Sequence, residues 1–167
     1  ISQVELITKT RESLLGVRYR IEGSVEKTME EIGAPDGTTF LVHNIFYNTP
    51  ARRKFLKTAM TEGGYISDLM ERMALSHPDI SFKFISNGQT KLQTSGNGNV
   101  KEIIYHIYGR EIAGALLPVS EDNEFFKVTG FIGKPLVTRG NRNFENYFIN
   151  GRYIKSKIIM KGIEDAY

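Results

Sequence analysis

The sequence predicts an α+β protein in two parts, a sheet with helices followed by a smaller βαβ-like unit. Apolar and polar residues alternate in short segments such as Val17 to Glu22, as expected for half-buried strands. Elsewhere apolar residues recur with the 3.6-residue period of an amphipathic helix. The Gly/Asn-rich stretch Ser95 to Asn99 has the composition of a linker and separates the two parts.

The overall composition is that of a soluble globular protein, with 40% apolar and 25% charged residues. The 167 residues are enough for one ordinary domain or two small ones. No apolar run reaches the roughly 18 residues of a membrane-spanning helix, so no membrane partner is expected. The sequence has no Cys, which excludes disulfides and thiolate metal sites, and it begins at Ile1 rather than Met, as an excised fragment would.

Residues 1–44 are predicted to form a meander of strands. Val4 to Thr8 is rich in β-forming residues. Glu26 to Ile32 would suit a helix by composition, but its short length between glycines favours a strand. The sequence Ala34-Pro35-Asp36-Gly37 has the chemistry of a turn, with Pro in the second position and Gly in the fourth.

The segment from Gly37 to Thr58 is predicted to contain a strand, an aromatic turn and the start of a helix. Thr49 is a good N-cap, and Pro50 would occupy the first helical position, where its missing N–H costs nothing. The helix is expected to carry a basic cluster around a small apolar stripe. The basic residues are Arg52, Arg53, Lys54 and Lys57, and the apolar ones are Ala51, Phe55 and Leu56.

The rest of the chain alternates helices and strands. Apolar periodicity predicts helices over 62–76 and 100–108, the second with Asn99 and Glu102 at capping-box spacing and an end at Gly109. Asn87-Gly88 predicts a two-residue hairpin turn. Further strands are expected over 115–119, 125–132 and 143–149, and a last helix over 156–167.

The usual catalytic motifs are absent from the sequence. His43, His77 and His106 share no metal-ligand spacing, so each is interpreted as a surface or packing residue, and no metal ligand is assigned. There is no Gly-x-Ser-x-Gly, Walker A or Gly-x-Gly-x-x-Gly motif, and no catalytic residue is assigned. Asp36-Gly37 is followed by Thr-Thr-Phe, which does not match an Asp-x-Gly-x-Gly box.

Two stretches of sequence carry a family resemblance. Gly37 to Thr58, with its Phe-Tyr-Asn-Thr-Pro-Ala-Arg-Arg-Lys-Phe-Leu core, resembles the signature of the MutL family of DNA mismatch repair proteins. Asn141 to Phe144 and Tyr147 to Ile154 resemble the second signature of that family. The resemblance implies that residues 1–95 are the C-terminal portion of a GHKL-type ATPase domain. Residues 96–99 would then be a linker, and 100–167 the start of a ribosomal-protein-like βαβ transducer domain.

The same resemblance implies a nucleotide-contact role for Gly37 and Thr38, whose hydroxyl would help an upstream Asp to recognise adenine. It places the Glu general base, the Mg²⁺-binding Asn, the Asp-Gly-x-Gly box and the Gly-rich lid upstream of Ile1. A lysine that reaches the terminal phosphate is expected beyond Tyr167. The complete protein is therefore expected to use ATP and Mg²⁺ as a weak ATPase, whereas this chain alone should bind neither appreciably.

The DNA-contact prediction depends on the basic C-terminal region. Between positions 134 and 161 there are seven basic residues against one acid, within a net charge of only +3. Asn150-Gly151 would form a tight turn that projects Arg152, with Lys155 and Lys157 close by. In the family, basic residues of this region line a DNA groove between two protomers, and Arg142 is added to the set. A solvated basic face fits the charge alone equally well. The cluster Arg52-Arg53-Lys54 either touches DNA or braces the ATPase domain, and the structural role is preferred.

The function implied by the resemblance is that of an ATP-driven dimeric clamp in mismatch repair. ATP binding would bring two N-terminal regions together around DNA, and the closed state would engage the mismatch recognition protein and a downstream nuclease or helicase. The protein would be cytoplasmic and nucleoid-associated in a bacterium, or nuclear in a eukaryote. The alternatives are another GHKL ATPase, such as a type II topoisomerase subunit or a chaperone, and an ATP-independent nucleic-acid-binding module.

Overall fold

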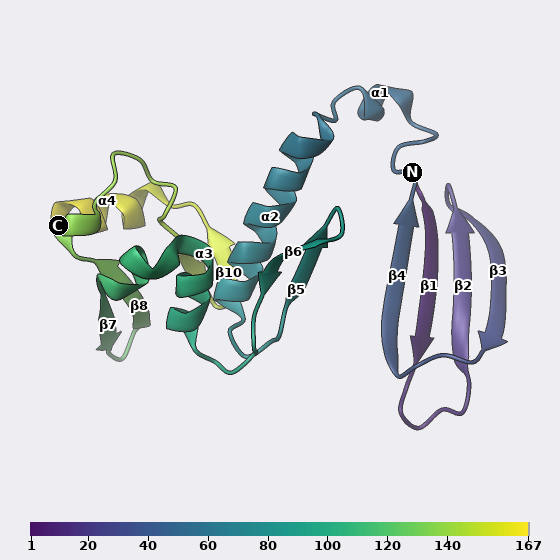
Figure 1. Cartoon of the computed structure of the whole chain (residues 1–167), viewed down its shortest axis with the longest axis horizontal. Coiled ribbons are helices and arrows are strands. Elements are labelled where there is room, and N and C mark those ends of the chain that lie inside the picture. Colours follow the sequence, from purple (N-terminus) through teal and green to yellow (C-terminus); the bar gives the residue numbers. More distant parts are fainter. Residues whose placement is uncertain (167) are drawn as a thin grey trace. The chain divides into compact units, whose positions relative to one another are not determined.

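The computed structural model describes residues 1–166 and divides the chain into two compact units, Ile1–Thr58 and Ala59–Tyr167. Apart from one helical turn, the first unit is made of strands, whereas the second mixes helices with two-stranded hairpins (Figure 1). The α+β fold class predicted from the sequence is therefore confirmed.

The first unit is a four-stranded antiparallel sheet. Its strands are β1 (Gln3–Lys9), β2 (Gly16–Glu22), β3 (Val25–Ile32) and β4 (Gly37–His43). They lie in the order β3-β2-β1-β4, so the fourth strand returns beside the first as in a Greek key. The predicted meander is wrong for β4, because the turn at residues 33–36 carries the chain across the end of the sheet.

The two faces of this sheet differ in character. Leu6 of β1 lies opposite Tyr19 of β2 and Phe40 of β4, so these three side chains share one face. Phe40 is 67% exposed, and all buried apolar side chains of the described residues belong to the second unit. On the other face, Arg18 Nε lies 3.0 Å from a carboxylate oxygen of Glu5. Among the described residues, the contacts of this sheet are therefore backbone pairing and surface ion pairs, and none of its apolar side chains is buried.

The helix predicted after the sheet is a single turn. α1 spans Pro50–Arg53 and ends at Lys54. Thr49 precedes it as predicted, but the Thr49 side chain makes no capping hydrogen bond. Phe55 is 81% exposed, so the expected apolar stripe does not pack, and short helices need such packing to persist. The extent predicted for this helix is therefore wrong, and the basic cluster lies on a helical turn and the loop after it.

The second unit combines helices with antiparallel hairpins. Its helices are α2 (Ala59–Ser76), α3 (Val100–Gly114) and α4 (Lys157–Ala166), with a short 3-10 helix η1 (Pro135–Val137). Its hairpins are β5 (Lys83–Ser86) with β6 (Gln89–Gln93), β7 (Leu116–Asp122) with β8 (Lys127–Gly133), and β9 (Tyr147–Ile149) with β10 (Arg152–Ile154). Tyr167, which the last predicted helix includes, lies outside the described residues.

Two predicted elements in this unit differ from the structure. In α3, the first helical segment does end at Gly109, whose φ of 85° and ψ of 174° are not helical, but a second segment that was not predicted continues to Gly114. The strand predicted over 143–149 is reduced to β9, because the residues before β9 form turns. The backbone N–H of Asn143 donates to Asn141 Oδ1 at 3.0 Å, and such local bonds compete with strand pairing.

The second unit has a small buried cluster at its core. Ala74 of α2, Leu92 of β6 and Ile103 of α3 are 0%, 6% and 3% exposed and pack together. Partly buried apolar side chains surround them, namely Met70, Leu75, Phe82, Phe84 and Ile107. This core joins α3 to α2 and β6, which lie on the other side of the predicted linker.

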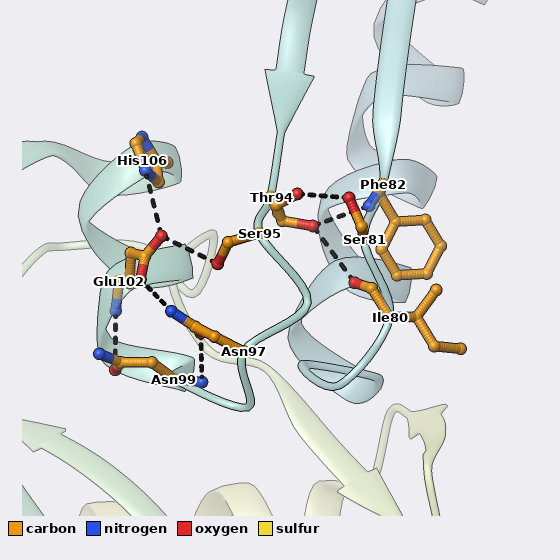
Figure 2. A network of polar contacts seen from close by, with 9 residues as sticks. All are labelled: Ile80, Ser81, Phe82, Thr94, Ser95, Asn97, Asn99, Glu102 and His106. Atoms are coloured by element: carbon orange, nitrogen blue, oxygen red, sulfur yellow. Dashed lines mark hydrogen bonds and ion pairs between the residues drawn. The ribbon is translucent and has the colours of Figure 1, made fainter.

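Side-chain hydrogen bonds hold the predicted linker at 96–99. Ser95 Oγ and Asn97 Nδ2 donate to the two carboxylate oxygens of Glu102, at 3.1 and 2.7 Å (Figure 2). The Glu102 backbone N–H donates to Asn99 Oδ1 at 3.2 Å, which confirms Asn99 as the N-cap of α3. The division into residues 1–95 and 100–167 stays a prediction about functional domains, since the compact units divide at Thr58.

Candidate functional site

The β9–β10 hairpin presents the basic residue that the sequence singles out. Asn150 and Gly151 have φ of 49° and 76°, as a two-residue type I′ turn requires, and Ile149 pairs with Arg152. The predicted tight turn is confirmed. Arg152 is exposed on β10 and, with Ile149, Asn150 and Ile154, lines a shallow depression of about 460 Å³.

The hairpin is docked on helix α2. The Arg72 guanidinium carbon lies 4.4 Å from the centroid of the Tyr153 ring, within the range of a cation–π interaction. At the turn, a Cβ added to Gly151 would lie 3.3 Å from His77 Cε1, so the turn backbone passes close to this imidazole. The Tyr153 ring also meets Phe148 of β9 edge-on, with centroids 5.9 Å apart.

The segment leading into β9 is tied to helix α3. Asn146 Nδ2 donates to the Tyr108 hydroxyl at 2.6 Å, and the Tyr108 ring meets Phe144 edge-on at 5.0 Å. Burial raises the pKa of Tyr108. The pKa of Tyr147 is raised to about 12, mainly by burial and then by the hydrogen bond that the Tyr147 hydroxyl donates to Glu145. Both phenols are neutral at physiological pH and act as packing and hydrogen-bonding groups.

The basic residues of this region are not equivalent. Arg152, Lys155 and Lys157 are exposed, and none of them forms an ion pair with another described residue. Arg142, by contrast, pairs with Glu164 of α4. Its charge is therefore largely matched within the chain, and the structure groups only the other three as unpaired cations in one short segment.

The predicted nucleotide-contact pair lies at the start of β4. Gly37 has φ 114°, a backbone conformation that favours glycine, and Thr38 follows it. The Thr38 hydroxyl is 2.9 Å from the Thr8 hydroxyl on β1, directly opposite in the register. Sequence reasoning missed Thr8, because only the pairing of β1 with β4 brings it beside Thr38.

Neither a metal centre nor a membrane span is found in the described part of the chain. No group of three or more His, Cys, Asp or Glu residues between positions 1 and 166 is arranged to hold a metal ion. No helix in the same range combines the length and apolarity that crossing a bilayer demands.

Comparisons with known proteins place the chain in a family. A family model described as DNA mismatch repair protein, C-terminal domain, matches residues 104–167. The DNA mismatch repair protein MutL of Agathobacter rectalis is 70% identical over 167 residues, which are all of this chain and 26% of that protein. MutL of Shouchella clausii is 40% identical, again over the whole chain and 25% of that protein. The chain thus spans about a quarter of the length of these relatives.

Solved structures show the same fold. The ADP complex of the Aquifex aeolicus MutL ATPase domain matches all of this chain and 64% of its own, with a TM-score of 0.83 at 23% identity. The N-terminal domain of a DNA repair protein matches 96% of this chain and 54% of its own, with a TM-score of 0.77 at 19% identity. At these identities the likeness concerns the fold alone, whereas the sequence matches along the whole chain indicate the class, a DNA mismatch repair protein. The chain belongs to the MutL family of DNA mismatch repair proteins.

Proposed function

We propose that this chain is the part of a MutL-type protein that couples a nucleotide-binding sheet to a DNA-contact hairpin, within an ATP-driven dimeric clamp. The identity of 70% to a MutL protein along all 167 residues carries the proposal. ATP with Mg²⁺ would be the cofactor of the complete protein, and the ADP complex of the Aquifex relative supports nucleotide use. These relationships do not favour a topoisomerase subunit, a chaperone or an ATP-independent module.

The partners in this proposal are those of a matchmaker in DNA repair. Two N-terminal regions would close around DNA when ATP binds, and the closed clamp would engage the mismatch recognition protein and a downstream nuclease or helicase. This work would take place in the cytoplasm of a bacterial cell, at the nucleoid. No catalytic residue is assigned to this chain.

The structure supports specific residues for the two contacts. Thr38 and Gly37 would lie at the nucleotide, with Thr8 fixing the Thr38 hydroxyl from the neighbouring strand. Arg152, Lys155 and Lys157 are the unpaired cations suited to phosphate oxygens. Arg142 was included in the predicted DNA set, and its pairing with Glu164 makes it the weakest member.

Measured DNA affinity of the full-length protein tests the hairpin assignment. Arg152→Gln removes one charge-assisted contact, so we expect a roughly tenfold loss of affinity for a double-stranded oligonucleotide in fluorescence anisotropy. The slope of log affinity against log salt, taken between about 50 and 200 mM, should fall by about 0.9. Gln89→Glu is the matched control, because Gln89 also follows an Asn-Gly turn and the change in charge is the same. Equal effects of the two variants would remove Arg152 from the DNA site.

A further inference from the structure

Two hairpins of the second unit have the same turn but different surroundings. The β5–β6 hairpin turns through Asn87 and Gly88, and the β9–β10 hairpin through Asn150 and Gly151, with almost equal φ values. A Cβ at Gly88 would meet no described atom within 4 Å, whereas one at Gly151 would meet the His77 ring. Turn chemistry therefore explains the shape of the second hairpin but not its fixed place against α2.

Because side chains alternate along β10, docking one face of the hairpin exposes Arg152 on the other. Neighbouring residues of a strand point to opposite faces, so Tyr153 and Arg152 face opposite ways. The Tyr153 ring is held under the Arg72 guanidinium at 4.4 Å, and the turn lies on His77. With one face of the hairpin held on α2, Arg152 is left exposed on the other face.

We propose that Arg72 of α2 and His77, the residue that directly follows this helix, are positioning residues that hold the β9–β10 hairpin so that Arg152 is presented to a DNA phosphate. The proposal rests on the proposed DNA-contact function and adds a cause for the orientation of Arg152. It also gives α2, which belongs to the predicted ATPase portion, a direct contact with a hairpin of the predicted transducer portion. A shift of α2 would then move Arg152.

Hydrogen exchange of the full-length protein tests the docking without reference to DNA. Arg72→Gln removes the cation over Tyr153, and we expect amide exchange across 147–154 to become at least about threefold faster. This factor corresponds to the free energy of a cation–π interaction of modest strength. Exchange across 83–93 should not change, because that hairpin is held through Leu92 in the core rather than by Arg72. Arg110→Gln on α3 is the control for loss of an exposed helical arginine. Unchanged exchange across 147–154 would overturn the proposal, whatever DNA binding shows.

A double-mutant cycle on DNA affinity separates positioning from direct contact. Arg72→Gln should weaken binding about threefold in the native background but have no further effect once Arg152 is Gln. Additive losses would mean that Arg72 acts on DNA independently of Arg152, which overturns the positioning role. Arg72→Lys keeps a cation near the ring and should restore most of the affinity. If Arg152→Gln alone leaves affinity unchanged, the DNA-contact function fails, while hydrogen exchange still decides the docking.

Discussion

The β5–β6 and β9–β10 hairpins have the same Asn-Gly turn, yet the molecule holds them in different ways. The first is fixed at its base, where Leu92 enters the core and Thr94, 4% exposed, accepts a hydrogen bond from the Phe82 backbone N–H at 2.9 Å (Figure 2). The second is fixed at its tip and outer strand, where His77 and Arg72 contact it. A hairpin anchored through its base leaves its tip unconstrained, whereas one anchored near its tip has its orientation set.

The two anchors also differ in how much they stabilise the fold and in how strongly they depend on geometry. Burial of an apolar side chain stabilises the whole unit and is insensitive to where the turn points. A cation over an aromatic ring contributes less free energy but depends on geometry. The weaker kind of anchor is found at the hairpin that carries the exposed Arg152.

The largest expected effect comes from the core anchor. Leu92→Ala removes a side chain that is 6% exposed and packs on Ala74 and Ile103, so the free energy of unfolding should fall by about 2 to 5 kcal/mol. Ile149→Ala, in the other hairpin, truncates a side chain that is 53% exposed and should cost less than about 1 kcal/mol. Urea denaturation followed by circular dichroism measures both. Equal losses would mean that the two hairpins are anchored alike.

The two turn glycines provide an effect of intermediate size. Alanine at either position is strained by about 1 to 2 kcal/mol, because φ is 74° at Gly88 and 76° at Gly151. Gly151→Ala should cost more than Gly88→Ala, since its Cβ would lie 3.3 Å from His77 Cε1. The excess should disappear when His77 is also replaced by Ala, which removes the ring. Thermal unfolding of Gly88→Ala, Gly151→Ala, His77→Ala and the double variant Gly151→Ala/His77→Ala checks this, and an excess that survives the loss of His77 would contradict close docking at the turn.

Local sequence chemistry predicted these turns but not their anchors. A type I′ turn requires two residues with positive φ, and Asn-Gly suits both positions, so this dipeptide identifies both hairpins. The contact of Arg72 with Tyr153 joins residues 81 positions apart and follows from packing alone. Thr8 beside Thr38 was missed for the same reason, since the register that joins them depends on β4 returning to β1.

The wrong boundaries have a related physical cause. The basic helix after Thr49 was predicted from its N-cap and Pro signals, which mark where a helix starts but not how long it is. In the structure this helix ends after Arg53, and Phe55 beyond it does not pack. The linker was predicted from Gly and Asn content, which is shared by flexible chains and by tight caps. Here Asn97 and Asn99 bond to Glu102, so side-chain hydrogen bonds hold this irregular stretch, and its role as a linker between functional domains stays a prediction.

The smallest effect concerns one carboxylate near each anchor. Hydrogen bonds from Asn97 and Ser95 lower the pKa of Glu102 below 4.5, so this group adds stability above its ordinary pKa, and that stability is lost as pH falls through the folded value. Burial, with repulsion from Asp68 second, raises the pKa of Glu71, so its ionisation costs stability as pH rises from 4.5 through the folded value.

Replacing each carboxylate by its amide should therefore shift stability in opposite directions. At pH 7 Glu102→Gln should lower the melting temperature by a small amount, and Glu71→Gln should raise it. The difference for Glu71→Gln should shrink as the pH falls from the raised folded pKa of Glu71 to 4.5, and that for Glu102→Gln as the pH falls from 4.5 through the lowered folded pKa of Glu102, because each protonated carboxyl resembles the amide. Differential scanning calorimetry at pH 7 and at acidic pH measures the sign of each change in melting temperature. If Glu71→Gln instead lowers the melting temperature at pH 7, the Glu71 carboxylate stabilises the fold as an anion, for example through the neighbouring Arg72 guanidinium. The cost of burying its charge would then be the smaller effect.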